Sequence, residues 1–147
     1  MNIFYLDNDP TKCAQQHVDK HCVKMILESA QIMSTAHRLN GTENDIIYKK
    51  THTKHPCVLW TLESLSNYKW LGEHAIEMCN EYTYRYEKQH KSKPILEWLI
   101  KNPINIPDLG LTKAKLAMPL EFHEEDPVKA YRRYYVENKK VLIITSV

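Results

Sequence analysis

The stretch HVDKHCVKMILESAQ (His17–Gln31) indicates the fold class and raises the first question about function. Wound at helical spacing, its apolar side chains, among them Cys22, Met25 and Ile26, fall on one broad face. A narrow polar stripe borders that face and recurs at steps of four, three, four and three residues: His17, His21, Lys24, Glu28 and Gln31. Such a stripe is either a solvated surface or the wall of a cleft beside a central helix.

Working outward from this stretch, the sequence predicts one uninterrupted helix from a cap at Asp9 to about Arg38. Pro10 suits the first turn of that helix, and the Asn-Gly pair within Leu39–Gly41 ends it. Residues 1–8, which precede the cap, are expected to form a short extended arm.

The rest of the chain predicts further helices and no alternating strand pattern. A loop over 42–54 leads to a second long helix that begins near Pro56, keeps helical spacing to Tyr82 and ends in basic residues. The later segments are a short helix after Pro94 (95–101), an ordered proline-rich loop (102–127), a helix that starts at EEDPVKAYRRYYVENKK, and an apolar tail, VLIITSV, that the pattern does not place. We therefore expect a single all-α domain over 1–147, a compact bundle of three main helices with an N-terminal arm and a long proline-rich loop.

Composition limits the classes of function. The chain has 147 residues, 43% hydrophobic, and a formal charge of +2, so nucleic-acid binding would need a local basic patch. Its four cysteines form no CxxC pair, which favours a reducing compartment and thiols used as small apolar groups. Only three glycines are present, which excludes phosphate loops built on glycine. Without a membrane-span or signal pattern, we expect a cytoplasmic monomer.

The polar stripe has a structural and a chemical interpretation. Lys24 and Glu28 at i, i+4 could be an ordinary surface ion pair, worth roughly a few tenths of a kcal/mol. A partly desolvated Glu28 could instead act as a general acid or base, with the histidines positioning a substrate. His17 and His21 could also bind a metal with Asp19 or Cys22, but those two project away from the stripe. We expect no metal and no cofactor.

Two other stretches could contact phosphates. In THTKHPCVLW, His52, Lys54 and His55 stand just before a helix start, where free N–H groups attract anions. In KAYRRYYVENKK, cations alternate with tyrosines that could stack on bases, or could equally belong to an amphipathic core helix: Lys129, Tyr131, Arg132, Arg133, Tyr134, Tyr135, Lys139 and Lys140.

These stretches together resemble the pyrimidine-dimer DNA glycosylase (endonuclease V-like) family. DKHCVKMILESAQIM (Asp19–Met33) is similar to the family's catalytic helix, KHPCVLWTLESLSNYKWL to the next helix, and AYRRYY to the family's aromatic-basic ending. The resemblance implies an all-α fold in which an N-terminal arm threads between the helices into a DNA-binding cleft. It also implies that the α-amine attacks C1′ of a damaged nucleotide, that a Schiff base forms as the base departs, and that a helix glutamate assists β-elimination. By motif position that glutamate is Glu28, and the cleft histidines are His21 and His55.

The implied chemistry suits a chain terminus, because an α-amine has a pKa near 8 and is partly neutral at pH 7. Asn2 is a poor context for removal of methionine, so the amine is expected to belong to Met1. Candidate catalytic residues are Met1, Asn2, Glu28 and His21; candidate DNA contacts are Lys24, Lys54, His55, Arg132, Arg133 and Tyr135. The expected partner is double-stranded DNA that carries a damaged or modified base. Two alternatives stay open: an N-glycosyl hydrolase or transferase on modified nucleosides without strand cleavage, and a non-catalytic viral DNA- or protein-binding module.

Overall fold

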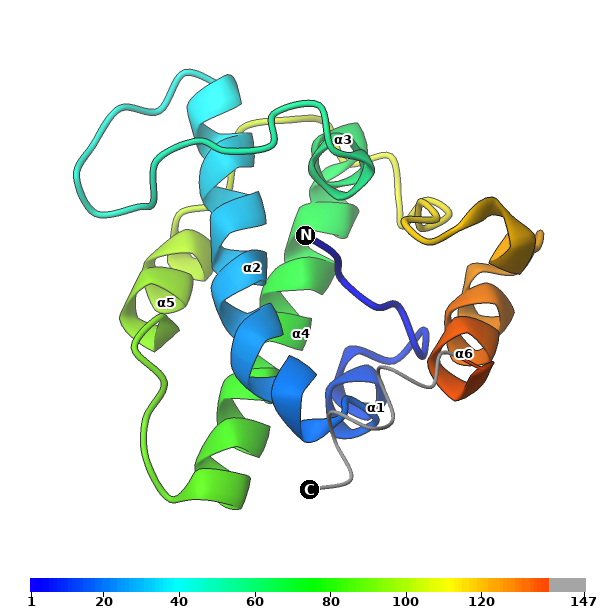
Figure 1. The fold of residues 1–147 in the computed structure, drawn as a ribbon. Helices are drawn as coiled ribbons and strands as arrows, with labels where there is room; N and C mark the ends of the chain where they lie inside the picture. The colour runs from blue at the N-terminus through cyan, green and yellow to red at the C-terminus, as the bar shows by residue number, and fades with distance from the viewer. Residues whose placement is uncertain (138–147) are drawn as a thin grey trace.

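The computed structural model describes residues 1–137, which form six α-helices, one short 3-10 helix and no β-strand (Figure 1). The elements are α1 (Pro10–Gln15), α2 (Asp19–Leu39), α3 (Pro56–Glu63), α4 (Leu65–Tyr86), α5 (Lys93–Lys101), η1 (Leu120–Phe122) and α6 (Pro127–Glu137). The all-α prediction is confirmed. Within the described residues, no helix is long and apolar enough to cross a membrane. The apolar tail, Lys139 and Lys140 lie outside the described residues.

The predicted first helix is divided into α1 and α2, so its expected continuity was wrong. Asp9 caps α1 as expected, with its carboxylate 2.9 Å from the amide nitrogen of Thr11. The chain then leaves the helix, and Val18 is extended, with ψ at 154°. The break is stabilised by distant partners, because the Val18 amide donates to the hydroxyl of Tyr135 at 3.3 Å. His17 therefore lies in the connection and is separate from the rest of the polar stripe.

The predicted second helix is likewise two helices, α3 and α4, separated by Ser64. Ser64 is extended (φ −159°, ψ 145°), and its hydroxyl caps α4 by accepting the amide of Ser66. The same hydroxyl accepts the amide of Leu109 at 2.8 Å, and the amide of Leu65 donates to the carbonyl of Pro107. The proline-rich segment thus satisfies the polar groups that the break leaves free.

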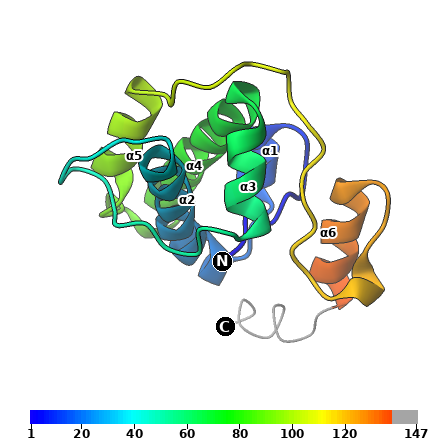
Figure 2. The same cartoon turned by 90° about the horizontal axis from the view of Figure 1, so that it is seen from above.

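The core lies between α2 and α4, with α1, α3 and α5 packed around them (Figures 1 and 2). Its largest fully buried side chains include Trp60, Tyr68, Ile26, Met33 and Leu71. All four cysteines are buried free thiols. The proline-rich segment is tied onto this core where Trp60 and Asn67 donate to the carbonyl and hydroxyl oxygens of Thr112.

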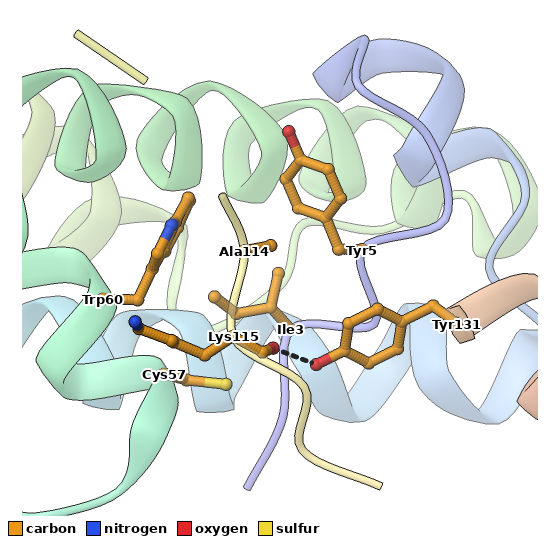
Figure 3. Close-up of a pocket in the computed structure, with 7 residues that line it drawn as sticks. All are labelled: Ile3, Tyr5, Cys57, Trp60, Ala114, Lys115 and Tyr131. Carbon is orange, nitrogen blue, oxygen red and sulfur yellow. Dashed lines mark hydrogen bonds between the residues drawn. The ribbon is translucent and has the colours of Figure 1, made fainter. Parts of the chain in front are cut away.

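The N-terminal arm is part of the interior. Residues 2–6 are buried, and the arm passes between α2, α3 and the proline-rich segment (Figure 2). Ile3 and Tyr5 of the arm line a small cavity together with Trp60 and Tyr131 (Figure 3), and its volume is only about 10 Å³. The hydroxyl of Tyr131 donates to the carbonyl of Lys115 at 2.8 Å. The arm therefore has one fixed path through the protein.

Candidate functional site

Three nitrogen atoms contact the carboxylate of Glu28 on α2. Its Oε1 lies 3.3 Å from the α-amine of Met1 and 3.1 Å from the amide nitrogen of Asn2, and its Oε2 lies 3.8 Å from Nζ of Lys24. The carboxyl side chain is only 9% exposed, so these charge-assisted contacts act with little screening by water. The structure thus brings together Met1, Asn2, Lys24 and Glu28.

The side chain of Asn2 fixes the path that carries Met1 to this carboxylate. Its Oδ1 accepts the amides of Ile3 and Phe4 at 2.7 and 2.9 Å, and its Nδ2 donates to the carbonyl of Ala117 at 2.8 Å. Phe4 is held with φ at 55°, a left-handed conformation that costs a non-glycine residue roughly 1–2 kcal/mol. Arm packing and the Asn2 bonds stabilise this conformation, so the α-amine is positioned before any substrate binds.

Met1 and Glu28 line a surface pocket of about 210 Å³. The residues that line it are Met1, Lys24, Leu27, Glu28, Gln31 and His52. Lys24, with a side chain that is 61% exposed, stands at the rim, where its ammonium can meet a phosphate. His52 has φ at 50°, and its Nδ1 lies 2.8 Å from the hydroxyl of Thr51. The pocket combines a nucleophilic amine, a carboxylate and a cation, which suits attack on an electron-poor carbon.

His55 borders the amine from the other side. As the N-cap of α3, it accepts the amide of Cys57 on its Nδ1 at 3.1 Å. Burial lowers the pKa of His55 below its usual value, and the positive N-terminus of the chain lowers it further. A neutral imidazole therefore lies close to Met1. Lys54 precedes it and is exposed.

His21 does not line the pocket. Its Nδ1 lies 2.5 Å from the hydroxyl of Tyr135, and its ring stacks on Phe4 with centroids 4.2 Å apart. Burial, followed by the neighbouring His17, lowers the pKa of His21 to about 4. Glu28 follows about two helical turns later. In this arrangement His21 contacts the arm.

The predicted DNA contacts on α6 also lie outside the pocket. Arg132 donates to the carbonyl of Leu6 and pairs with Asp7 at 2.9 Å. Arg133 pairs with Glu124 at 3.4 Å, and its guanidinium lies over the ring of Phe122. Tyr135 is 7% exposed. All three have intramolecular partners that attach α6 to the arm and to η1.

Three residues that line the pocket were not among the candidate residues predicted from the sequence: Leu27, Gln31 and His52. Leu27 is 36% exposed and lies outside the apolar arc of α2, a position that could have marked it as part of an open surface. His52 stood in a motif singled out for phosphate binding, but no pattern favoured it over its neighbours. Lys24, Glu28 and Gln31 of the stripe do form the cleft wall.

Two buried histidines make the stability of the fold sensitive to acid. His17 and His74 are 2% and 0% exposed, and burial lowers their pKa values to about 4 and about 3. Between about pH 6.5 and pH 4 the unfolded chain binds protons that the folded chain does not, so the free energy of unfolding decreases as the pH falls through this window.

Each of these histidines is expected to contribute a slope of about 1.4 kcal/mol per pH unit there. Urea unfolding at pH 7.5, 6.5, 5.5 and 4.5, with EDTA present to keep metals off the rings, measures this slope. His74→Phe should flatten it, whereas His123→Gln, an exposed control, should not. An equal slope in wild type and His74→Phe would contradict the assignment.

Comparisons with known proteins give one result. A family model described as pyrimidine dimer DNA glycosylase matches residues 1–94, which is 94 of the 147 residues. The matched range includes Met1, Asn2, Lys24, Glu28 and His55. Searches of curated proteins and of solved structures gave no significant match.

Proposed function

Because the chain belongs to the pyrimidine dimer DNA glycosylase family, we propose that it excises a damaged or modified base from duplex DNA and then cleaves the strand as an AP lyase. The α-amine of Met1 is the nucleophile, and Glu28 is the acid–base carboxylate. One observation carries this proposal: the amine lies 3.3 Å from a nearly buried carboxylate oxygen, at the wall of an open pocket.

The first stage is base release. Glu28 accepts a proton from the Met1 ammonium, and the neutral amine attacks C1′ of the nucleotide. A bond forms between the amine nitrogen and C1′, while the bond from C1′ to the base breaks, and the base leaves with that electron pair and takes up a proton. The proton that the base takes up comes from Glu28, which is thereby a carboxylate again and stabilises the positive charge on the sugar adduct.

The second stage is strand cleavage. The bond between C1′ and the ring oxygen breaks, that oxygen takes a proton, and C1′ becomes an iminium carbon bonded to the Met1 nitrogen. Glu28 then removes a proton from C2′, and the 3′ phosphate leaves with the electrons of the C3′–O bond. The contact between Glu28 and the amine supports one carboxylate serving both stages.

Binding of DNA is supported by the groups around the pocket. Lys24 and His52 are exposed at its edge, and Lys54 is exposed in the loop that leads to His55. These side chains suit contacts with the phosphates that flank an extruded nucleotide.

A panel of duplex oligonucleotides tests the proposal. Each contains one cyclobutane pyrimidine dimer, one uracil or one abasic site, and a matched undamaged duplex is the control. We expect cleavage without alkali at the abasic site and at one or more base lesions. Strand cleavage that appears only after alkali treatment would show that the protein releases the base but has no lyase activity. If no oligonucleotide in the panel loses a base or is cleaved, the proposed function is wrong.

A further inference from the structure

Away from the pocket, three side chains with metal-binding atoms meet against the N-terminal arm. They are Cys13 of α1, His17 of the connection to α2, and His74 of α4. The thiol sulfur and one ring nitrogen from each histidine all lie within 4.8 Å of one another. The three residues are at most 2% exposed. Neither the glycosylase chemistry proposed above nor the polar stripe uses this group.

His74 has a ring nitrogen without a partner. Its Nδ1 lies 3.3 Å from the carbonyl of Pro10, which suits donation of the Nδ1 proton to that oxygen. Its Nε2 is fully buried and makes no hydrogen bond. A buried polar atom in this state is unfavourable unless another ligand satisfies it.

His17 also has a ring nitrogen that a neutral imidazole leaves without a hydrogen-bond partner. Its Nδ1 lies 2.7 Å from the carbonyl of Cys13, and its Nε2 lies 3.2 Å from the carbonyl of Ile3. A neutral imidazole carries one N–H, so it donates to the nearer carbonyl and leaves a bare Nε2 facing a second oxygen. With the proton on Nδ1, each ring donates to a backbone carbonyl and its Nε2 carries no proton, which is the usual arrangement of histidines that bind a metal.

The surroundings of Cys13 also suit a bound cation. Its thiol donates to the carbonyl of Phe4 and accepts the amide of Leu6, both at 3.3 Å. A thiolate would still accept the hydrogen bond from the Leu6 amide. The Phe4 carbonyl would still accept a hydrogen bond from the same amide, at 2.9 Å. Loss of the thiol proton therefore leaves no backbone group without a partner.

We propose that Cys13, His17 and His74 bind one zinc ion through Sγ and two Nε2 atoms. One thiolate and two imidazoles are the ligand types of zinc sites, and the Ile3 carbonyl is the neighbouring oxygen for a fourth position. In tetrahedral zinc sites the ligand atoms are about 3.5 Å apart, so binding draws the three atoms together by up to about 1.3 Å. The Cys13 proton is released to solvent.

This zinc would act as a structural clamp. It joins α1 and α4 beside the segment from Ile3 to Leu6, whose backbone already contacts Cys13 and His17. That segment directly follows the amine that the proposed glycosylase uses. The proposal does not depend on that activity, because its test measures metal rather than DNA.

The test uses the full chain, reduced and stripped of metal, and titrated with zinc or cobalt(II). We expect one zinc per chain, a cobalt–thiolate charge-transfer band in the near ultraviolet, and a rise in Tm of about 5 °C or more at saturating zinc. Cys13→Ala should lose the band and the rise in Tm, while Cys79→Ala, which removes an equally buried thiol elsewhere, should keep both.

His74→Gln provides a second variant, which keeps a polar side chain at that position. It should bind zinc at least about ten-fold more weakly than wild type. Zinc binding by wild type no tighter than by Cys13→Ala, or a cobalt band that Cys79→Ala loses and Cys13→Ala keeps, would overturn the proposal.

Discussion

Replacing Glu28 by glutamine is expected to lower the rate of base release and strand cleavage about 10²–10⁴-fold. The neutral side-chain amide of glutamine cannot accept a proton from the Met1 ammonium or from C2′. It also does not stabilise the positive charge that develops on the sugar. Its carbonyl oxygen can still accept the amide of Asn2, so the arm should stay in place. Single-turnover cleavage of a lesion duplex measures the loss, and a binding assay shows whether affinity is kept.

The control for this variant is Glu73→Gln, which removes an exposed carboxylate from α4. It should cleave within about two-fold of wild type, because exposed substitutions far from a site have small effects. Wild-type cleavage by Glu28→Gln, with an unchanged Tm, would show that the carboxylate at the amine takes no part in the reaction.

Blocking the α-amine is expected to remove the covalent step of the reaction. Acetylation of Met1 removes the nucleophilic electron pair, so borohydride should trap no covalent adduct, and strand cleavage should fall by about 10³-fold or more. In the unmodified protein the adduct should map to the peptide that contains Met1. Lys24 is the competing amine, since its Nζ lies 3.8 Å from the same carboxylate.

Lys24→Arg separates the two amines, because it keeps the charge and removes the competing nucleophile. It should still form the adduct. An adduct on Lys24 in wild type would contradict the role of Met1. If the acetylated protein still releases bases without cutting the strand, the activity is N-glycosyl hydrolysis rather than the lyase reaction.

Local patterns were sufficient to predict the all-α class, several helix ends and the shared face of Lys24, Glu28 and Gln31. Asp9 and Pro10 start α1, the Asn-Gly pair ends α2, and Lys24, Glu28 and Gln31 share one face because four- and three-residue steps follow the helical period. The position of the amine depended on a family resemblance, because no local pattern shows that an arm enters a core.

The errors have long-range causes. Neither His17 nor Ser64 is a glycine or proline, so periodicity continued through both, although distant groups stabilise each break: Tyr135 at one and Pro107 at the other. Contact of Arg132 and Tyr135 with DNA stays a prediction. Their intramolecular partners, Leu6, Asp7 and His21, become neighbours only in the folded chain, so no local pattern indicates them.

The fixed path of the arm has a consequence for biosynthesis. Met1 and Asn2 are synthesised long before several groups that hold the arm, which come from the end of the described chain: Ala117, Tyr131, Arg132 and Tyr135. Domains form during synthesis from the N-terminus onward, so α2 to α5 can pack while the arm still lacks these partners. We therefore expect the amine to reach Glu28 only late in maturation, so that a nascent polypeptide lacks the paired amine and carboxylate.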